Sequence, residues 1–87
     1  ELPMPTIPTV HDNGTKKADL LFALTTADEA LDKAAAALAK TGPNPRDYYP
    51  QGLGAFDKAS DEHETRMRQI GKMRADLREV VNAIYFK

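Results

Sequence analysis

The fold is decided by residues 20–38, which read LLFALTTADEALDKAAAAL. Apolar side chains recur in this stretch at alternating spacings of four and three residues, at Leu20, Leu24, Ala27, Leu31, Ala34 and Leu38. This pattern is typical of a helix that buries one narrow seam against a second helix. The small side chains of Ala27 and Ala34 would let that second helix approach closely, and alanine has the highest helix propensity. We therefore predict a helix over residues 15–41.

Turn-forming residues bound this first helix on both sides. Asn13-Gly14 predicts a turn, after which the Thr15 hydroxyl is placed to accept a hydrogen bond from the first helical turn as an N-cap. At the other end, Gly42 suits a left-handed position and Pro43 cannot continue a helix. Residues 42–52 are expected to connect the first helix to a second one, and three prolines stiffen this connection.

A second helix is predicted over residues 53–86. Its seam has the helical period and consists of Phe56, Ser60, His63, Met67, Ile70, Arg74, Leu77, Val81 and Ile84. Gly71 interrupts this helix, either as a tolerated weak point or because a neighbour packs closely over it. A short connection makes the two helices antiparallel and places Leu31 near His63. The predicted fold class for residues 1–87 is therefore all-α, a single domain built on an antiparallel two-helix hairpin.

Residues 1–14 are expected to form an extended, proline-rich arm, because three prolines in this stretch disfavour a helix. In the predicted register Lys16 lies near Arg78, so everything beyond Arg78 overhangs the start of the first helix. The overhang is apolar and includes Val81, Ile84, Tyr85 and Phe86. Exposed apolar patches generally mark contact surfaces, so either the arm or another subunit must cover this one. A hairpin with one seam and no disulfide also predicts a homo-oligomer.

Composition narrows the function classes. The chain has 12 basic and 13 acidic side chains and a net charge of -1, so it lacks the excess of basic residues expected of a nucleic-acid binder. No stretch approaches the ~20 apolar residues that span a membrane. Without Cys, and with only two His residues, we predict no metal site, no cofactor and a reducing cytoplasmic setting. No nucleophile has an evident base and no glycine-rich phosphate loop occurs, so we predict that the protein is not an enzyme.

Residues 46–52, RDYYPQG, are the first of three polar blocks that stand out from the helical background. Tyr48 and Tyr49 offer flat faces, Arg46 offers a planar cation, and Asp47 and Gln51 add polar groups. Such a set can hold a nucleotide. In the alternative interpretation, one tyrosine seals the end of the hairpin while Arg46 and Asp47 cap free groups at the helix ends.

The second block precedes the first helix, and the third lies on the second helix. His11, Asn13 and Thr15 stand at a helix N-terminus, which attracts anions, although they equally suit an ordinary turn and cap. His63 either forms a hydrogen bond to a loop group such as Tyr48, Tyr49 or Asp47, or contacts a ligand between subunits. We expect the polar blocks to cluster near one end of the hairpin.

Arg66 belongs to a basic stretch of the second helix that acidic residues are expected to neutralise. Glu62 is placed to pair with Arg66, and Glu64 with Arg68. The predicted register also brings Asp28 and Asp32 of the first helix near these two arginines. In the alternative interpretation, oligomerisation leaves arginines free to line an anion pocket.

The blocks HDNGT and DYYPQG, together with Ala55-Phe56 and Ala59, resemble those of small uncharacterised helical proteins encoded by bacteriophages and prophages. The resemblance covers most of the chain from His11 onward and implies a phage origin, without implying an activity. Two functions are then compatible with the residues. One is a binding protein that sequesters a nucleotide-derived immune signal of the bacterial host. The alternative is a protein-interaction module that inhibits a host protein or serves phage assembly.

Overall fold

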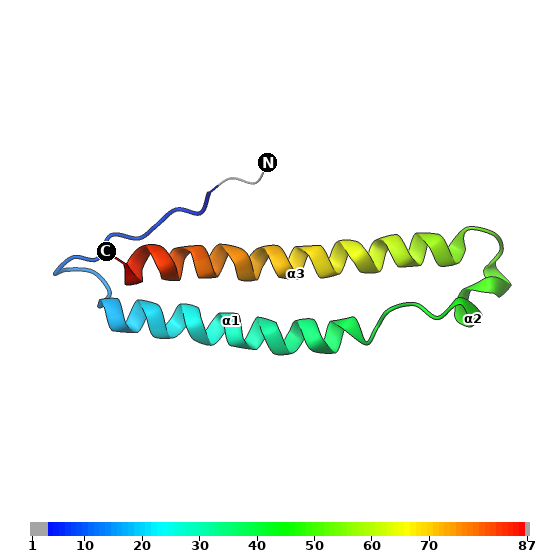
Figure 1. Ribbon diagram of the computed structural model, residues 1–87, viewed down its shortest axis with the longest axis horizontal. Coiled ribbons are helices and arrows are strands. Elements are labelled where there is room, and N and C mark those ends of the chain that lie inside the picture. Colours follow the sequence, from blue (N-terminus) through cyan, green and yellow to red (C-terminus); the bar gives the residue numbers. More distant parts are fainter. Residues whose placement is uncertain (1–3, 87) are drawn as a thin grey trace.

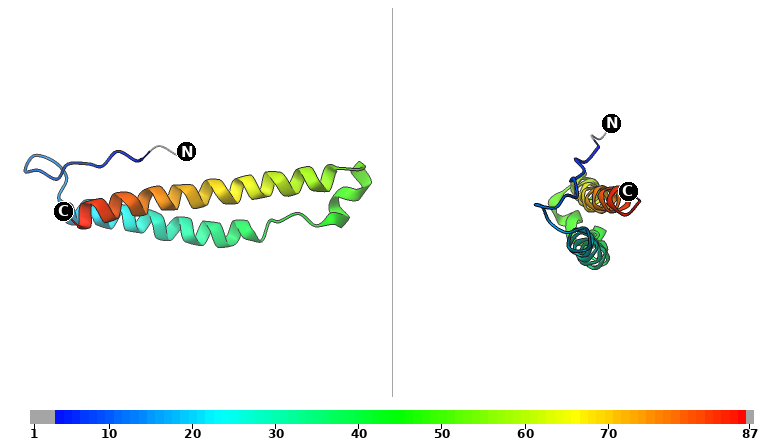
Figure 2. Two further views of the ribbon diagram at one scale, coloured as in Figure 1. Left: turned by 45° about the horizontal axis from the view of Figure 1, so that its top comes forward. Right: turned by 90° about the vertical axis from the view of Figure 1, so that its left-hand side faces the viewer.

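The computed structural model describes residues 4–86, so Glu1, Leu2 and Pro3 of the expected arm and Lys87 lie outside the described residues. The described part contains helices α1 (Lys17–Ala39), α2 (Pro45–Tyr48) and α3 (Ala55–Tyr85), with a short 3-10 helix, η1 (Tyr49–Gln51). No strand occurs within these residues, and the all-α class is confirmed. α1 and α3 pack against each other, side by side and antiparallel (Figure 1, Figure 2).

The face of α3 that meets α1 is the one predicted. All nine residues of its seam, from Phe56 to Ile84, are half-buried or buried. The face of α1 differs from the prediction, because Ala27 and Ala34 are exposed while Asp28 and Ala35 are half-buried. The seam therefore runs through Leu24, Leu31 and Leu38 as expected but turns Asp28 inward between them, where it pairs with two arginines of α3.

The register of the two helices also differs from the prediction. Asp28 lies beside Arg74 and not beside Arg66, which is a shift of eight residues or roughly two helical turns. His63 accordingly lies next to Gly42 and not opposite Leu31, since its Nε2 atom is 3.6 Å from the position that a Cβ atom on Gly42 would occupy. The physical reason is the connection, which contains α2 and η1 and carries the chain beyond the end of α1 before α3 begins (Figure 1).

The predicted overhang at the C-terminal end of α3 is consequently wrong. Ile84 is 1% exposed and Val80 is 9% exposed, and with Ile70 they are the buried apolar residues of the described chain. The expected proximity of Lys16 and Arg78 is wrong as well, because Arg78 pairs with Asp28. The part of α3 that extends past α1 is instead its start, and α2 and η1 contact α3 there.

The helix ends use groups other than those predicted. The N-cap of α1 is Lys16 without a side-chain hydrogen bond, so Thr15 is not the cap. At its C-terminal end, the Thr41 hydroxyl donates to the carbonyl of Leu38 at 2.7 Å. The positive φ angles of the described residues occur at Gly52 and Gly54 rather than at Gly42. The turn at Asn13-Gly14 is confirmed by the hydrogen bond from the Gly14 amide to the His11 carbonyl, at 3.1 Å.

Residues 4–10 have no regular secondary structure and run back beside the C-terminal half of α3 (Figure 1, Figure 2). Ile7 and Pro8 are half-buried, and Pro8 lines a hollow together with Lys17 and Ile84. This segment therefore contributes to the apolar surroundings of the best-buried residue in the chain.

The burial of Ile84 gives a direct test of the register. We expect Ile84→Ala to lower the free energy of unfolding by about 2–5 kcal/mol, because truncation of a buried apolar side chain leaves a cavity. Phe86→Ala is the matched control, since Phe86 is exposed and its loss is expected to cost less than about 0.5 kcal/mol. Urea denaturation measures both values. Equal costs would contradict the register described here.

Gly71 allows a second test of the packing. A Cβ atom added to Gly71 meets no atom of the described chain within 4 Å, so no neighbour packs closely over it. We expect Gly71→Ala to stabilise the protein by about 0.5–1 kcal/mol through helix propensity. Gly54→Ala is the control, because Gly54 has a φ of +89° and an alanine there is expected to lose about 1–2 kcal/mol. A loss of stability in Gly71→Ala would show that the surface over α3 is occupied.

Candidate functional site

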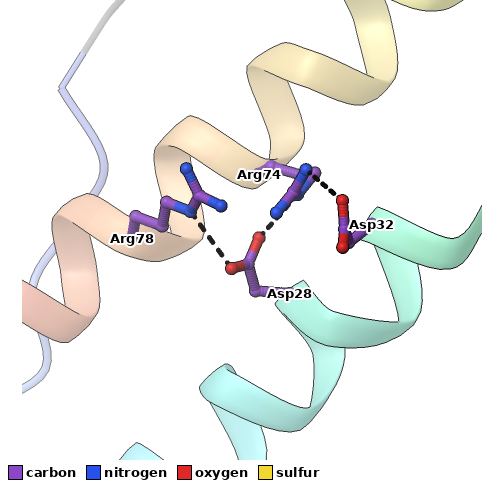
Figure 3. A network of polar contacts seen from close by, with 4 residues as sticks. All are labelled: Asp28, Asp32, Arg74 and Arg78. Carbon is purple, nitrogen blue, oxygen red and sulfur yellow. Dashed lines mark hydrogen bonds and ion pairs between the residues drawn. The ribbon is translucent and has the colours of Figure 1, made fainter. Parts of the chain in front are cut away.

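A network of ion pairs joins the middle of α1 to α3 (Figure 3). Arg74 Nε donates to Asp28 Oδ1 at 2.9 Å, and Arg74 Nη1 donates to Asp32 Oδ1 at 2.9 Å. Arg78 Nε donates to Asp28 Oδ2 at 3.1 Å, so both oxygens of Asp28 are engaged. The side chains of Arg74 and Asp28 are only 20% and 17% exposed, which places this pair within the helix interface.

The electrostatics of this network stabilise its charged forms. The hydrogen bond from Arg74 holds the pKa of Asp28 below its usual range, against the opposing effect of partial burial and with help from Arg78. The hydrogen bond with Asp28 likewise raises the pKa of Arg74. Because the inward-facing oxygens and guanidinium are all used in pairing within the chain, we interpret this network as structural.

The RDYYPQG block lies at the end of the helix pair where α2 and η1 contact α3. Arg46, Asp47 and Tyr48 belong to α2, whereas Tyr49 and Gln51 belong to η1. Asn44 begins this segment, since its Oδ1 atom accepts a hydrogen bond from the Arg46 amide at 3.0 Å. The block is therefore held by short helical turns and not by an irregular loop.

The two tyrosines of this block differ in their surroundings. Tyr48 is half-buried, whereas Tyr49 is 75% exposed. Tyr48 thus fits the interpretation in which one tyrosine seals the end of the helix pair. Tyr49 presents its ring to solvent, and the neighbouring Arg46 forms no ion pair within residues 4–86. An exposed aromatic face and an unpaired guanidinium are thereby held on adjacent turns.

His63 lies at the same end, on the side of α3 that faces the end of α1. Its Nδ1 atom is buried and has no hydrogen-bond partner in the described chain, and its ring forms no hydrogen bond to Tyr48, Tyr49 or Asp47. The expected hydrogen bond to a loop group is therefore wrong. A buried, unpaired polar atom is costly, so His63 retains one unused hydrogen-bonding group beside the end of α1.

Arg66 is exposed one turn beyond His63 and lines a hollow of about 490 Å³ on α3. A second hollow of about 400 Å³ follows along the same helix. Both are open to solvent, and together they are lined by Lys58, Asp61, Glu62, Thr65, Arg66, Arg68, Gln69 and Lys72. Thr65 and Gln69 were not singled out from the sequence, although their spacing of four residues on the side away from the seam would have indicated a shared face.

In the described part of the chain, the predicted neutralisation of the basic stretch is confirmed for Arg74 and Arg78 but is wrong for Arg66 and Arg68. Its ion pairs engage Asp28 and Asp32 with Arg74 and Arg78, and none involves Arg66, Arg68 or Lys72. Arg68 instead donates to the hydroxyl of Thr65 at 3.3 Å. The cause is the register, which moves the two acidic residues of α1 about two turns away from Arg66.

His11, Asn13 and Thr15 lie at the opposite end of a molecule that is 61 Å long (Figure 1). All three are exposed, and the His11 ring packs over Gly14, where an added Cβ atom would lie 2.8 Å from His11 Nε2. The expectation that all polar blocks cluster near one end is therefore wrong. The structure places the RDYYPQG block against α3 and places His63 beside Gly42 at the end of α1, with Arg66 about one turn further along α3. It leaves the His11 block apart from all of these (Figure 1).

No family model, curated protein or solved structure matches the chain. Within residues 4–86, no group of three or more acidic, histidine or cysteine side chains is arranged to hold a metal ion. None of the helices in the same residues is both long enough and apolar enough to cross a membrane.

The pKa of Asp28 provides a test of the ion-pair network. Because that pKa is lowered in the folded state, ionised Asp28 stabilises the protein above the ordinary aspartate pKa of about 3.9, and this contribution is lost as the pH falls through the lower folded-state value. We expect Asp28→Asn to lower the stability clearly at pH 7 and progressively less as the pH falls below the ordinary aspartate pKa, as measured by chemical denaturation. Asp32→Asn is the control with a smaller expected effect, because Asp32 is 65% exposed. A pH-independent effect of Asp28→Asn would contradict the pairing.

Proposed function

We propose that this chain is a non-enzymatic, phage-encoded binding protein that sequesters a nucleotide-derived immune signal in the cytoplasm of the infected bacterium. Its framework is an antiparallel two-helix hairpin with an extended proline-rich arm, and it acts as a homo-oligomer. The phage origin follows from the resemblance of the HDNGT and DYYPQG blocks. The nucleotide class follows from the chemistry of the site.

The observation that carries the proposal is the exposure of Tyr49, which follows the exposed Arg46 by three residues on consecutive short helical turns. A tyrosine ring that is 75% exposed contributes little to the folded core, and short helical turns fix it in place. A nucleobase stacks on such a ring, while a guanidinium can stack or donate two hydrogen bonds to a phosphate. This pairing of an aromatic face with an unneutralised arginine is suited to a nucleotide rather than to a neutral apolar ligand.

In the same proposal, the basic residues of α3 bind the anionic part of the ligand. Arg66, Arg68 and Lys72 are exposed and form no ion pair within the described residues. His63 adds a buried Nδ1 atom without a partner at the same end of the molecule. Because the hollows beside these residues are open, we propose that a second subunit closes the site around the ligand.

A protein-interaction module is the second candidate, and the exposed apolar side chains favour it. Phe22, Leu53, Tyr85 and Phe86 are all exposed, and Tyr85 and Phe86 form an edge-to-face pair with ring centres 5.0 Å apart. Exposed aromatic groups of this kind are enriched at protein interfaces. In this candidate function the protein inhibits a host protein or takes part in phage assembly.

A thermal-shift screen distinguishes the two candidates. The purified protein is heated with cyclic dinucleotides, cyclic trinucleotides or ADP-ribose derivatives, with the corresponding linear mononucleotides as controls. A ligand at 100 times its Kd is expected to stabilise the fold by about 2.7 kcal/mol and to raise the Tm. The absence of any shift across the screen, together with specific enrichment of one host or phage protein, would support the interaction module instead.

Single substitutions then locate the site. Tyr49→Ala and Arg46→Ala are expected to abolish the ligand-induced rise in Tm while leaving the Tm of the free protein within a few degrees, because neither side chain is buried. Tyr48→Ala is the matched control and is expected to lower the Tm of the free protein, since Tyr48 is half-buried. Normal ligand binding by Tyr49→Ala and Arg46→Ala would place the site elsewhere on the molecule.

A further inference from the structure

α1 has a second apolar face that no residue of the described chain covers. It consists of five exposed alanines at spacings of four and three residues: Ala23, Ala27, Ala30, Ala34 and Ala37. Helical geometry places these residues roughly a quarter of a turn away from Leu24, Leu31 and Leu38, which meet α3. We call this surface the alanine face. Because its side chains are small, another helix can approach it closely.

The charges along one edge of the alanine face are arranged with acids first and bases last. In chain order they are Asp19, Glu29, Lys33 and Lys40. All four side chains are exposed, and none forms an ion pair within residues 4–86. If two copies of α1 lie antiparallel with Ala30 at the centre, the same edges meet. Asp19 of each copy then faces Lys40 of the other, and Glu29 faces Lys33.

The parallel arrangement has no such match. In the parallel arrangement the charged edge of one copy meets the opposite edge of the other copy, where Leu24, Leu31 and Leu38 pack against α3 and offer no charged partner. The edge is therefore complementary to itself in one orientation only. A surface that complements itself about a two-fold axis is what a symmetric dimer requires.

One chain alone buries few apolar side chains, and this favours a dimer. Only Ile70, Val80 and Ile84 are buried among the apolar residues of the described chain, and a single helix–helix seam gives a small protein little stability. Phe22 lies on the same edge as Lys33 and Lys40 and is 74% exposed. In the antiparallel arrangement its ring lies over the aliphatic stem of Lys40 of the other copy, which would cover a large apolar side chain.

We infer that the alanine face of α1 binds the alanine face of a second copy of this chain, antiparallel and across a two-fold axis close to Ala30. The interface adds a subunit contact on α1 to the homo-oligomer of the proposed function, and this contact is separate from the open hollows on α3. It does not depend on the identity of any ligand. The experiments below contain no nucleotide, so their failure is distinguishable from a failure of nucleotide binding.

Disulfide trapping tests the position of the axis, because the natural chain contains no cysteine. Ala30→Cys places two thiols near the axis, and a disulfide forms when the Cα atoms approach to about 4.4–6.8 Å. Ala36→Cys is the control, another exposed alanine that lies roughly a third of a turn around α1 from Ala30 and outside the alanine face. In a glutathione redox buffer we expect Ala30→Cys to form covalent dimers at least about tenfold faster than Ala36→Cys. Equal rates would overturn the inference.

Sedimentation equilibrium tests the interface without a cross-link. Ala30→Glu brings two like charges together at the axis and is expected to halve the mass of the assembly, whereas Ala36→Glu keeps the natural mass. Circular dichroism checks that both variants retain their helices. Lys33→Glu is expected to weaken association, and the double exchange Glu29→Lys with Lys33→Glu is expected to restore it. A monomeric natural protein at about 100 µM, or an unchanged mass in Ala30→Glu, would overturn the inference.

Discussion

The ion pair between Asp28 and Arg74 fixes how the two long helices lie against each other. The apolar residues of the seams repeat with nearly the same spacing along both helices, so several registers would bury similar apolar surface. A partly buried aspartate that engages two arginines is satisfied in one of these registers only. The position of this polar group therefore selects the alignment that the apolar side chains leave open. This register determines which residues lie side by side at the two ends of the helix pair.

The sequence predicted the helical class, the seam of α3 and the turn at Asn13-Gly14, because helical periodicity and turn chemistry are local properties. It did not predict the register, because an alignment between distant segments depends on the length that the connection spans. The short turns of α2 and η1 lengthen that span. The prediction misplaced the seam of α1 for a related reason. Ala27 and Asp28 occupy adjacent positions, and a pattern of apolar residues favours the alanine as the seam residue. The partner that draws Asp28 inward is 46 residues away.

The same register explains which parts of the candidate site could be predicted from the sequence. Arg46, Tyr48 and Tyr49 are at one end because α2 and η1 contact α3. His63 and Arg66 lie further along α3, and His63 is beside Gly42 at the end of α1. His11, Asn13 and Thr15 are at the other end of the long axis. Once the acidic residues of α1 pair with Arg74 and Arg78, the basic residues earlier in α3 lack acidic partners on α1. A structural pairing in the middle of the molecule thus leaves positive charge available on the exposed side of α3.

A double-mutant cycle between Asp28 and Arg74 tests the central claim most directly. The stabilities of Asp28→Asn, Arg74→Gln and the double variant are measured by urea denaturation, and the same cycle is repeated with Arg66→Gln in place of Arg74→Gln. We expect a clear coupling energy between Asp28 and Arg74, and effects of Asp28 and Arg66 that add within about 0.5 kcal/mol. Additive effects of Asp28 and Arg74, with coupling between Asp28 and Arg66, would show that the helices pack in the other register and would contradict this account.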